Sequence, residues 1–222
     1  TTQQGKNVLV TAVKGNFDDA QSGVKAIFTD RAFADELKGM GVRLSSANSI
    51  NWGRLVPQVA YYFSAYCDMV NAGTVSPGDE INIAVPTGNF GNILAAYIAK
   101  LCGLPVKRFI CASNKNNVLT DFIQSGTYDK NRPFYLTTSP SMDILISSNL
   151  ERLLYLLSGR NDAEVRGYMR ALSESGRYTV SQELHSAITA EFACGFADDA
   201  RAAETIRRTF EEKRYLADPH TA

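Results

Sequence analysis

A glycine-rich turn between an apolar run and a helical segment constrains the fold more than any other feature of this sequence. Ile81 to Val85 is an uncharged run typical of a buried strand, and helical spacing follows from Ile93 to Cys102. A second apolar run, Val106 to Ala112, predicts another strand. Strand, helix and strand in this order favour right-handed crossovers, so we expect an α/β protein with a parallel sheet flanked by helices.

The segments around this unit are assigned from periodicity and turn residues. Before it we expect strands at Asn7 to Val13 and Val42 to Leu44, and helices at Ala20 to Phe28, Arg31 to Lys38 and Arg54 to Val70. After it we expect a largely helical C-terminal part, with helices at Val118 to Gln124, Leu150 to Leu157, Ala163 to Ser173, Gln182 to Cys194 and Ala200 to Lys213. We therefore divide the chain into an α/β region, 1–140, and a helix-rich segment, 141–222, which continues the same domain or forms a small lobe.

Composition excludes several classes of protein. Among 222 residues, 23 Lys and Arg balance 23 Asp and Glu, so no summed charge draws the chain to nucleic acid or to a membrane surface. No apolar run approaches the roughly 18 residues that cross a bilayer, so we expect a soluble protein. The four cysteines are widely spaced and only two histidines occur, so we expect no metal site and a reducing cytoplasm.

The turn from Pro86 to Asn92 has the properties of a loop that binds phosphate. It lies between a strand and a helix, where backbone N–H groups converge at the positive end of the helix dipole. Gly88 and Gly91 permit positive φ and a close approach to an anion, while Thr87 and Asn89 offer side-chain donors. The G-x-x-G spacing fits neither the dinucleotide motif nor the Walker sequence. By spacing alone, an ordinary strand-to-helix turn is equally consistent.

A second polar cluster lies earlier in the chain, at the start of the helix predicted from Arg54 to Val70. Two amides, a hydroxyl and a guanidinium occur within seven residues, at Asn48, Asn51, Ser49 and Arg54. Such a group can clamp a second anion, because Arg54 can form bidentate, charge-assisted hydrogen bonds with phosphate. Taken alone, the cluster favours simple helix capping by Ser49 or Asn51, with Arg54 in solvent.

Several segments of the chain together resemble threonine synthase. They are Asn48-Ser49-Ile50-Asn51-Trp52-Gly53-Arg54-Leu55-Val56-Pro57-Gln58, Pro86 to Asn92, Pro105-Val106-Lys107-Arg108-Phe109, Ser113-Asn114-Lys115-Asn116-Asn117 and Asp218-Pro219-His220-Thr221-Ala222. They occur in the order of the family and with similar separations, over nearly the whole chain.

The resemblance implies a fold-type II pyridoxal-phosphate (PLP) enzyme of threonine biosynthesis, cytoplasmic, converting O-phospho-L-homoserine and water to L-threonine and phosphate. It assigns the PLP phosphate to Gly88, Asn89, Phe90, Gly91 and Asn92. It assigns the substrate phosphate to Asn48, Ser49 and Arg54. In the mechanism it implies, Arg54 stabilises the phosphate that leaves.

The chain departs from the family at the covalent anchor. The Schiff-base lysine of the family lies in a His-Gly-Pro-Thr-x-x-Phe-Lys-Asp type segment, which is absent here, as is a Ser-Gly-Asp-Thr-Gly loop. The lysines that we compared with the catalytic position do not match it, namely Lys14, Lys25, Lys100 and Lys115. We therefore expect a central fragment of the enzyme that has no catalytic residue and is inactive alone. Exposed sheet edges favour its association into a homo-oligomer.

Two other readings stay open. Another fold-type II PLP lyase or dehydratase would share the glycine-rich loop, although it would not be expected to match the segment from Asn48 to Gln58. A non-enzymatic fragment that only binds anions is the second alternative.

Overall fold

The computed structural model describes residues 5–15 and 17–222, and its internal contacts divide the chain into two units, Thr1–Ser45 and Ser46–Ala222. All the site residues expected from the sequence belong to the second unit. The boundary expected between residues 140 and 141 is a separate prediction and stays one.

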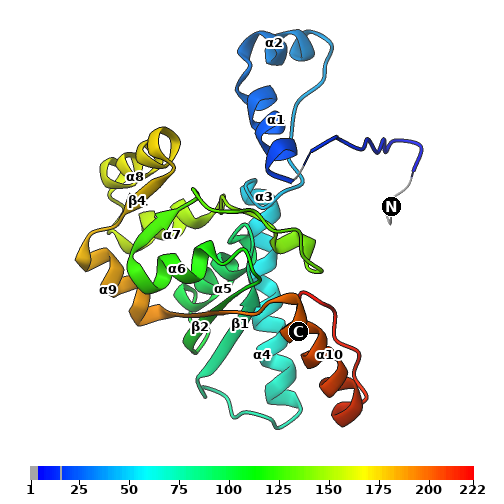
Figure 1. Ribbon diagram of the computed structural model, residues 1–222, viewed down its shortest axis with the longest axis vertical. Coiled ribbons are helices and arrows are strands. Elements are labelled where there is room, and N and C mark those ends of the chain that lie inside the picture. The colour runs from blue at the N-terminus through cyan, green and yellow to red at the C-terminus, as the bar shows by residue number, and fades with distance from the viewer. Residues whose placement is uncertain (1–4, 16) are drawn as a thin grey trace. The chain divides into compact units, whose positions relative to one another are not determined.

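The described part of the first unit contains two helices, α1 (Phe17–Thr29) and α2 (Arg31–Gly39), drawn in blue in Figure 1. The start of α2 is set by Asp30, whose side chain accepts a hydrogen bond of 3.0 Å from the N–H of Phe33. The helix ends one residue later than expected, and Gly41 takes positive φ just beyond it. None of the residues of α2 is buried.

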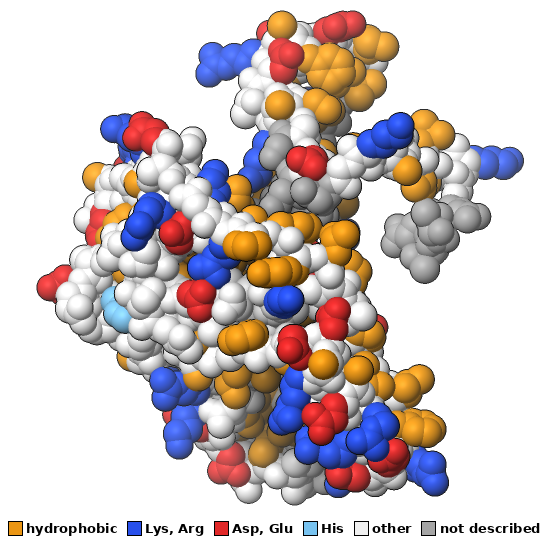
Figure 2. Space-filling model, in the orientation of Figure 1, with side chains coloured by type: hydrophobic (Ala, Val, Ile, Leu, Met, Phe, Trp, Pro, Cys, Tyr) orange, Lys and Arg blue, Asp and Glu red, His pale blue; other side chains and the backbone are white. Residues whose placement is uncertain are grey.

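The two strands predicted in the first unit do not form. Residues 7–13 and 42–44 are not assigned to any strand, and the Leu9 side chain is 97% exposed. A strand needs a neighbour that pairs with its N–H and C=O groups, and no described segment provides one here. Hydrophobic side chains consequently lie at the surface over α1 and α2, as Figure 2 shows.

The second unit is built on the predicted parallel sheet, which confirms the α/β fold class. Its three strands are β1 (Ile81–Pro86), β2 (Val106–Ser113) and β5 (Phe192–Phe196), in the order β1-β2-β5. Both pairings are parallel. Helix α5 (Gly91–Leu101) connects β1 to β2 and forms the expected strand–helix–strand unit.

The helix expected from Arg54 to Val70 is broken. Helix α3 (Trp52–Leu55) leads into a short 3-10 turn, η1 (Val56–Gln58), and α4 (Val59–Asn71) follows. Pro57 lies in the 3-10 turn, and because proline has no N–H it cannot donate to the preceding turn of a continuous helix.

The C-terminal part is mainly helical, as expected. Its elements are α6 (Val118–Ser125), β3 (Thr127–Asp129), the 3-10 turn η2 (Pro140–Met142), α7 (Leu150–Leu157), α8 (Asp162–Ser175), β4 (Arg177–Thr179), α9 (Gln182–Glu191) and α10 (Asp199–Lys213). Two of its helices, α6 and α9, pack on the sheet (Figure 1). Strands β3 and β4 pair antiparallel to form a two-stranded sheet that the sequence did not predict. Helix α10 carries charges of both signs (Figure 2).

The helix expected from Gln182 to Cys194 is wrong beyond Glu191, where β5 begins. The Phe192 ring is 1% exposed and stacks on Phe109 of β2, with ring centroids 5.2 Å apart. Pairing with β2 and burial of this ring therefore outweigh the local helical pattern.

The core is formed by the sheet together with α5, α6, α7 and α9. Helix α5 is apolar on nearly every face, which is typical of a helix packed on several sides. Within the described residues, no helix has the length and apolar character needed to cross a membrane.

Candidate functional site

The glycine-rich loop lies at the carboxyl edge of the parallel sheet. It begins at Pro86, the last residue of β1, and leads directly into α5. Ligands of open α/β sheets bind outside this edge. A cavity of about 370 Å³ lies there, and its lining includes Pro86, Ser113, Asn114, Asp198 and His220.

Several backbone N–H groups of this loop are available to an anion. Within the described part of the chain, no acceptor takes the N–H groups of Gly88, Asn89, Phe90 or Asn92. The N–H of Gly91 is engaged, because it donates to Asn89 Oδ1 at 2.9 Å. The available donors stand at the N-terminus of α5, where the helix dipole is positive. The loop therefore keeps the donors that a phosphate requires.

The strained residue of the loop is Phe90. Its φ of 63° lies in the left-handed region, which costs a residue with a side chain roughly 1–2 kcal/mol. Its ring is 1% exposed and lies 5.8 Å from the ring of Phe192, centroid to centroid. Burial of the ring holds the backbone in the conformation that precedes α5.

Gly88 and Gly91 allow close packing, and neither uses the positive φ that a glycine permits. A Cβ atom on Gly88 would lie 2.7 Å from the carbonyl oxygen of Ser141. A Cβ atom on Gly91 would lie 2.1 Å from Ser49 Oγ. The glycine at position 91 is therefore what lets the two predicted anion-binding segments touch.

Polar side chains of the loop are largely used to fix its shape. The sequence suggested the Thr87 hydroxyl as a donor to an anion. In the structure this hydroxyl instead donates to the carbonyl of Val85 at 2.6 Å. Asn92 accepts from the Tyr62 hydroxyl at 2.6 Å and donates to Gln58 Oε1 at 3.0 Å. Burial raises the pKa of Tyr62, so its hydroxyl remains a donor even at a pH where an exposed tyrosine ionises. The amide of Asn92 thus ties the loop to α4 and η1.

The second polar cluster forms a compact loop before α3. Asn48 Oδ1 accepts from the N–H of Ile50 at 3.0 Å. Asn51 caps α3 by accepting from the N–H of Gly53 at 3.0 Å, so the capping role expected for this residue is correct. Ser49 instead turns inward, is 9% exposed and packs on Gly91.

Arg54 faces a cavity of about 360 Å³ beside this loop. The cavity is lined by Ala47, Ser49, Gly53, Arg54, Pro57, Gln58 and Tyr61. The Arg54 side chain is exposed, and its Nε donates to the carbonyl of Ala47 at 3.3 Å. Among the described residues, Arg54 forms no ion pair with a carboxylate. Its charge is therefore available to an anion in this cavity.

A segment that sequence reasoning missed closes over the glycine-rich loop. Ser147 Oγ donates to the carbonyl of Gly88 at 2.7 Å. Asn149 donates to the carbonyl of Asn89 through its N–H at 3.0 Å and through its side chain at 2.9 Å. In the sequence, the polar residues Ser147-Ser148-Asn149 before a helical segment indicate only the start of a helix. They give no sign of contact with the glycine-rich loop.

The motif from Ser113 to Asn117 anchors this closing segment. The buried carboxylate of Asp143 accepts from the side chains of Asn114 and Asn116, at 2.8 Å and 3.0 Å. It also accepts from the N–H of Thr137 at 2.9 Å. A buried carboxylate with several donors is well satisfied, so the motif positions the segment that packs on Gly88.

The C-terminal motif contacts the same segment through His220. The N–H of Ser141 donates to His220 Nε2 at 3.2 Å, which makes this nitrogen an acceptor. The hydrogen-bond network therefore assigns the proton of a neutral ring to Nδ1, which lies 2.7 Å from Asp218 Oδ1. Hydrogen bonds from the backbone and side chain of His220 lower the pKa of Asp218. No cluster of metal-ligating side chains occurs within the described residues.

Comparison with known proteins relates the chain to threonine synthases and threonine synthase-like proteins. No family model matches the chain. It is 43% identical over 221 residues to human threonine synthase-like 1, a match that covers 99% of this chain and 30% of that protein. It is 41% identical over 222 residues to the threonine synthase of Pseudomonas aeruginosa, covering 100% of this chain and 45% of that protein.

Solved structures give the same result. The PLP-bound threonine synthase from Brucella melitensis matches with a TM-score of 0.81 and 46% identity, over 93% of this chain and 42% of that one. Yeast threonine synthase matches with a TM-score of 0.78 and 35% identity, over 93% of this chain and 41% of that one. The chain thus spans less than half the length of these relatives. By sequence and by fold, this chain is a homologue of threonine synthase, and the match covers nearly all of the 222 residues of this chain.

Proposed function

We propose that this chain is a central part of a PLP-dependent threonine synthase, which converts O-phospho-L-homoserine and water to L-threonine and phosphate. The observation that carries the proposal is the contact between the two predicted anion-binding segments at Gly91 and Ser49. An enzyme with a phosphorylated cofactor and a phosphorylated substrate needs two neighbouring anion sites.

The residues present fit the cofactor phosphate. The N–H groups of Gly88, Asn89, Phe90 and Asn92 have no acceptor within the described part of the chain, and Gly91 completes the turn. An anion at the N-terminus of a helix gains from such donors and from the dipole. PLP, when bound, would supply an electron sink for chemistry at the carbon atoms of the substrate.

The second loop fits the substrate phosphate. The guanidinium of Arg54 is the charged group of the 360 Å³ cavity, and Asn48 and Ser49 shape the loop beside it. A guanidinium offers several N–H donors to phosphate oxygens and offsets their charge. Arg54 would therefore hold the substrate and stabilise the phosphate that leaves.

The proposal includes an anchor for the cofactor outside this chain, so the chain alone is expected to be inactive. Lys100 forms an ion pair with Glu191 at 2.6 Å, and Lys115 lies over the Tyr135 ring at 4.2 Å from its centroid. These contacts give Lys100 and Lys115 structural roles, so neither is proposed as the anchor of the cofactor.

Compartment and assembly are part of the same proposal. All four cysteines are free, which supports a reducing compartment such as the cytoplasm. The exposed apolar side chains of the first unit support association between copies, as in a homo-oligomer.

The test uses the protein expressed from its complete reading frame. We expect it to bind PLP, seen as absorbance in the visible region, and to release phosphate from O-phospho-L-homoserine. Arg54→Met should lower kcat/KM for this substrate by on the order of a hundredfold, because charged hydrogen bonds to the phosphate are lost. Arg54→Lys should recover part of this loss.

Arg170→Met serves as the control, because Arg170 is exposed on α8. A protein that binds PLP but acts only on substrates without phosphate would support another fold-type II lyase instead. A protein that binds no PLP would support a non-enzymatic fragment.

A further inference from the structure

Asn149 contacts both predicted anion-binding segments at once. It is fully buried, at 0% exposure. Its side-chain N–H₂ group donates to the carbonyl of Asn89 at 2.9 Å and to Ser49 Oγ at 3.1 Å. Its backbone N–H also donates to the carbonyl of Asn89, at 3.0 Å. A single amide therefore joins the glycine-rich loop to the loop before α3.

The side chain of Asn149 makes these contacts and does not cap the helix that it precedes. Asn149 occupies the N-cap position of α7, where an asparagine normally accepts a hydrogen bond from the first turn. No such hydrogen bond forms here. Its Oδ1 instead accepts from Nη1 of Arg152, one turn later, at 2.8 Å. The helix start is thus used to join two loops.

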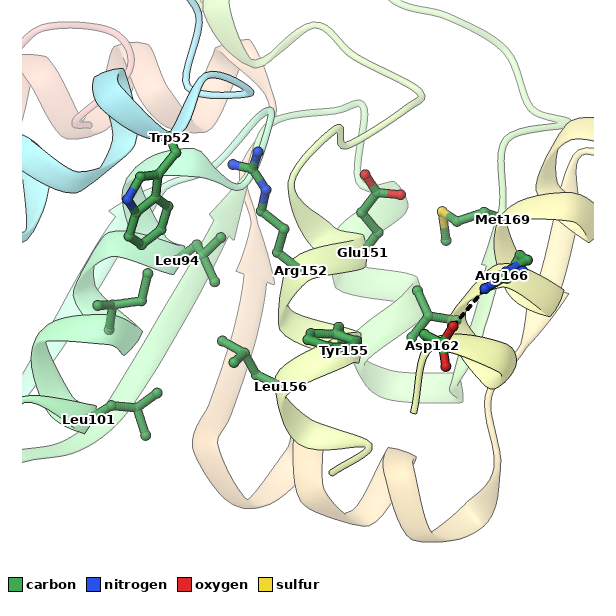
Figure 3. A pocket seen from close by; sticks show the side chains of 12 residues that line it. Trp52, Leu94, Leu101, Glu151, Arg152, Tyr155, Leu156, Asp162, Arg166 and Met169 are labelled. Atoms are coloured by element: carbon green, nitrogen blue, oxygen red, sulfur yellow. Dashed lines mark hydrogen bonds and ion pairs between the residues drawn. The ribbon is translucent and has the colours of Figure 1, made fainter. Parts of the chain in front are cut away.

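Arg152 completes the connection from the same helix. Its Nη1 also donates to the carbonyl of Ser49 at 3.0 Å, and its Nη2 donates to the carbonyl of Ile50. Figure 3 shows this side chain extending from α7 toward the segment that carries Trp52. The planar fork of an arginine suits two carbonyl groups and an amide oxygen together. Within the described residues it has no carboxylate partner.

Packing makes the connection stiff. Ser49 Oγ and Cβ already lie so close to Gly91 that no Cβ atom fits between them. Movement of the loop before α3 toward α5 therefore pushes on the start of that helix, and movement away from it strains the hydrogen bonds of Asn149 to Ser49 and Asn89.

We infer that Asn149 and Arg152 are positioning residues that couple the cofactor-phosphate loop to the substrate-phosphate loop. Occupation of either anion site then changes the affinity of the other. This inference rests on the proposed function for the identity of the two ligands, while the connection itself rests on the contacts above. Linkage requires that the effect be reciprocal.

Amide hydrogen exchange of the protein expressed from its complete reading frame tests the inference. Without ligand, Arg152→Met should raise exchange by on the order of tenfold in two hydrogen-bonded segments, 46–51 and the first turns of α5, 91–97. Arg166→Met is the matched control, since Arg166 lies on the exposed surface of α8 and pairs with Asp162 at 2.6 Å (Figure 3). It should raise exchange in neither segment. A rise confined to 46–51 in the Arg152→Met protein would overturn the coupling.

Amide hydrogen exchange in the presence of PLP provides a second test. Residues with a purely structural role would not transmit protection from one segment to the other. In the unaltered protein we expect protection of 88–92 and a smaller, transmitted protection of 46–51. The transmitted part should disappear in Arg152→Met and in the nearly isosteric Asn149→Asp, which loses the side-chain donors. Protection of 88–92 without any transmitted protection in the unaltered protein would contradict the inference.

Failure of the proposed function gives a different result. If PLP protects neither segment in the unaltered protein, the cofactor assignment is wrong, and the comparison without ligand still decides whether Arg152 connects the loops. If Arg152→Met does not fold, Arg152→Lys replaces it. A lysine keeps the charge but lacks the fork, so the same two segments should change to a smaller extent.

Discussion

At Gly91 the absence of a side chain is what brings the two polar segments of this protein together. The sequence indicates a glycine suited to positive φ, whereas the structure shows a glycine required by the proximity of Ser49. The difference is physical: backbone freedom is a local property, while close packing depends on a residue 42 positions earlier in the chain.

The first prediction concerns this contact. Gly91→Ala should reduce the free energy of unfolding by about 1–3 kcal/mol, because the added methyl group overlaps the Ser49 side chain. Ser49→Gly in the same protein should restore much of the loss. Gly167→Ala is the control, since a Cβ atom there meets nothing within 4 Å on α8. Denaturant unfolding measures all of these proteins, and equal stability of Gly91→Ala and the unaltered chain would refute the contact.

The elements follow the sequence where the local pattern and the tertiary contacts agree. Strands β1 and β2 and helix α5 form as expected, because apolar runs of this kind lose little by being buried on all sides. Strand β5 was missed, since its first three residues, Phe192 to Cys194, continue the pattern of the predicted helix and become part of a strand only beside β2.

The second prediction concerns the central strand β2. Burial raises the pKa of the Cys111 thiol to about 12, from 9.0. Above pH 9 the unfolded chain loses this proton while the folded chain keeps it, so the free energy of unfolding should fall as the pH rises from 9 toward 12. The slope contributed by one such group is at most about 1.4 kcal/mol per pH unit.

Unfolding of Cys111→Ala at pH 8 and pH 10 checks this prediction. The variant should lose less stability between these two pH values than the unaltered chain. Val85→Ala provides a core control without a titrating group, because Val85 pairs with Cys111 across the sheet. It should be less stable at both values and show the slope of the unaltered chain. The same slope in Cys111→Ala would count against the burial effect.

For the whole molecule, the division into two units has a consequence for proteolysis. The bond after Arg43 lies close to the boundary at Ser45, and the Arg43 side chain is exposed. Trypsin should cut the 222-residue chain early at this bond and leave residues 44–222 as a persistent fragment. Mass spectrometry over a time course measures the order of cleavage. The bond after Arg108 in β2 is the internal control, because its backbone is paired within the sheet. Cleavage there before Arg43 would contradict the prediction.

By itself, the sequence determined the α/β class, the strand–helix–strand unit and the two polar segments, because these depend on patterns within a few turns of chain. The sequence also provided the candidate residues of both anion sites, from Asn48 to Arg54 and from Gly88 to Asn92. The tertiary structure decided that the two segments touch and that Asn149 and Arg152 hold them. It also left the apolar residues 7–13 without a partner strand among the described residues. Contacts between residues 60 to 103 positions apart determine the first result, and no local pattern encodes them.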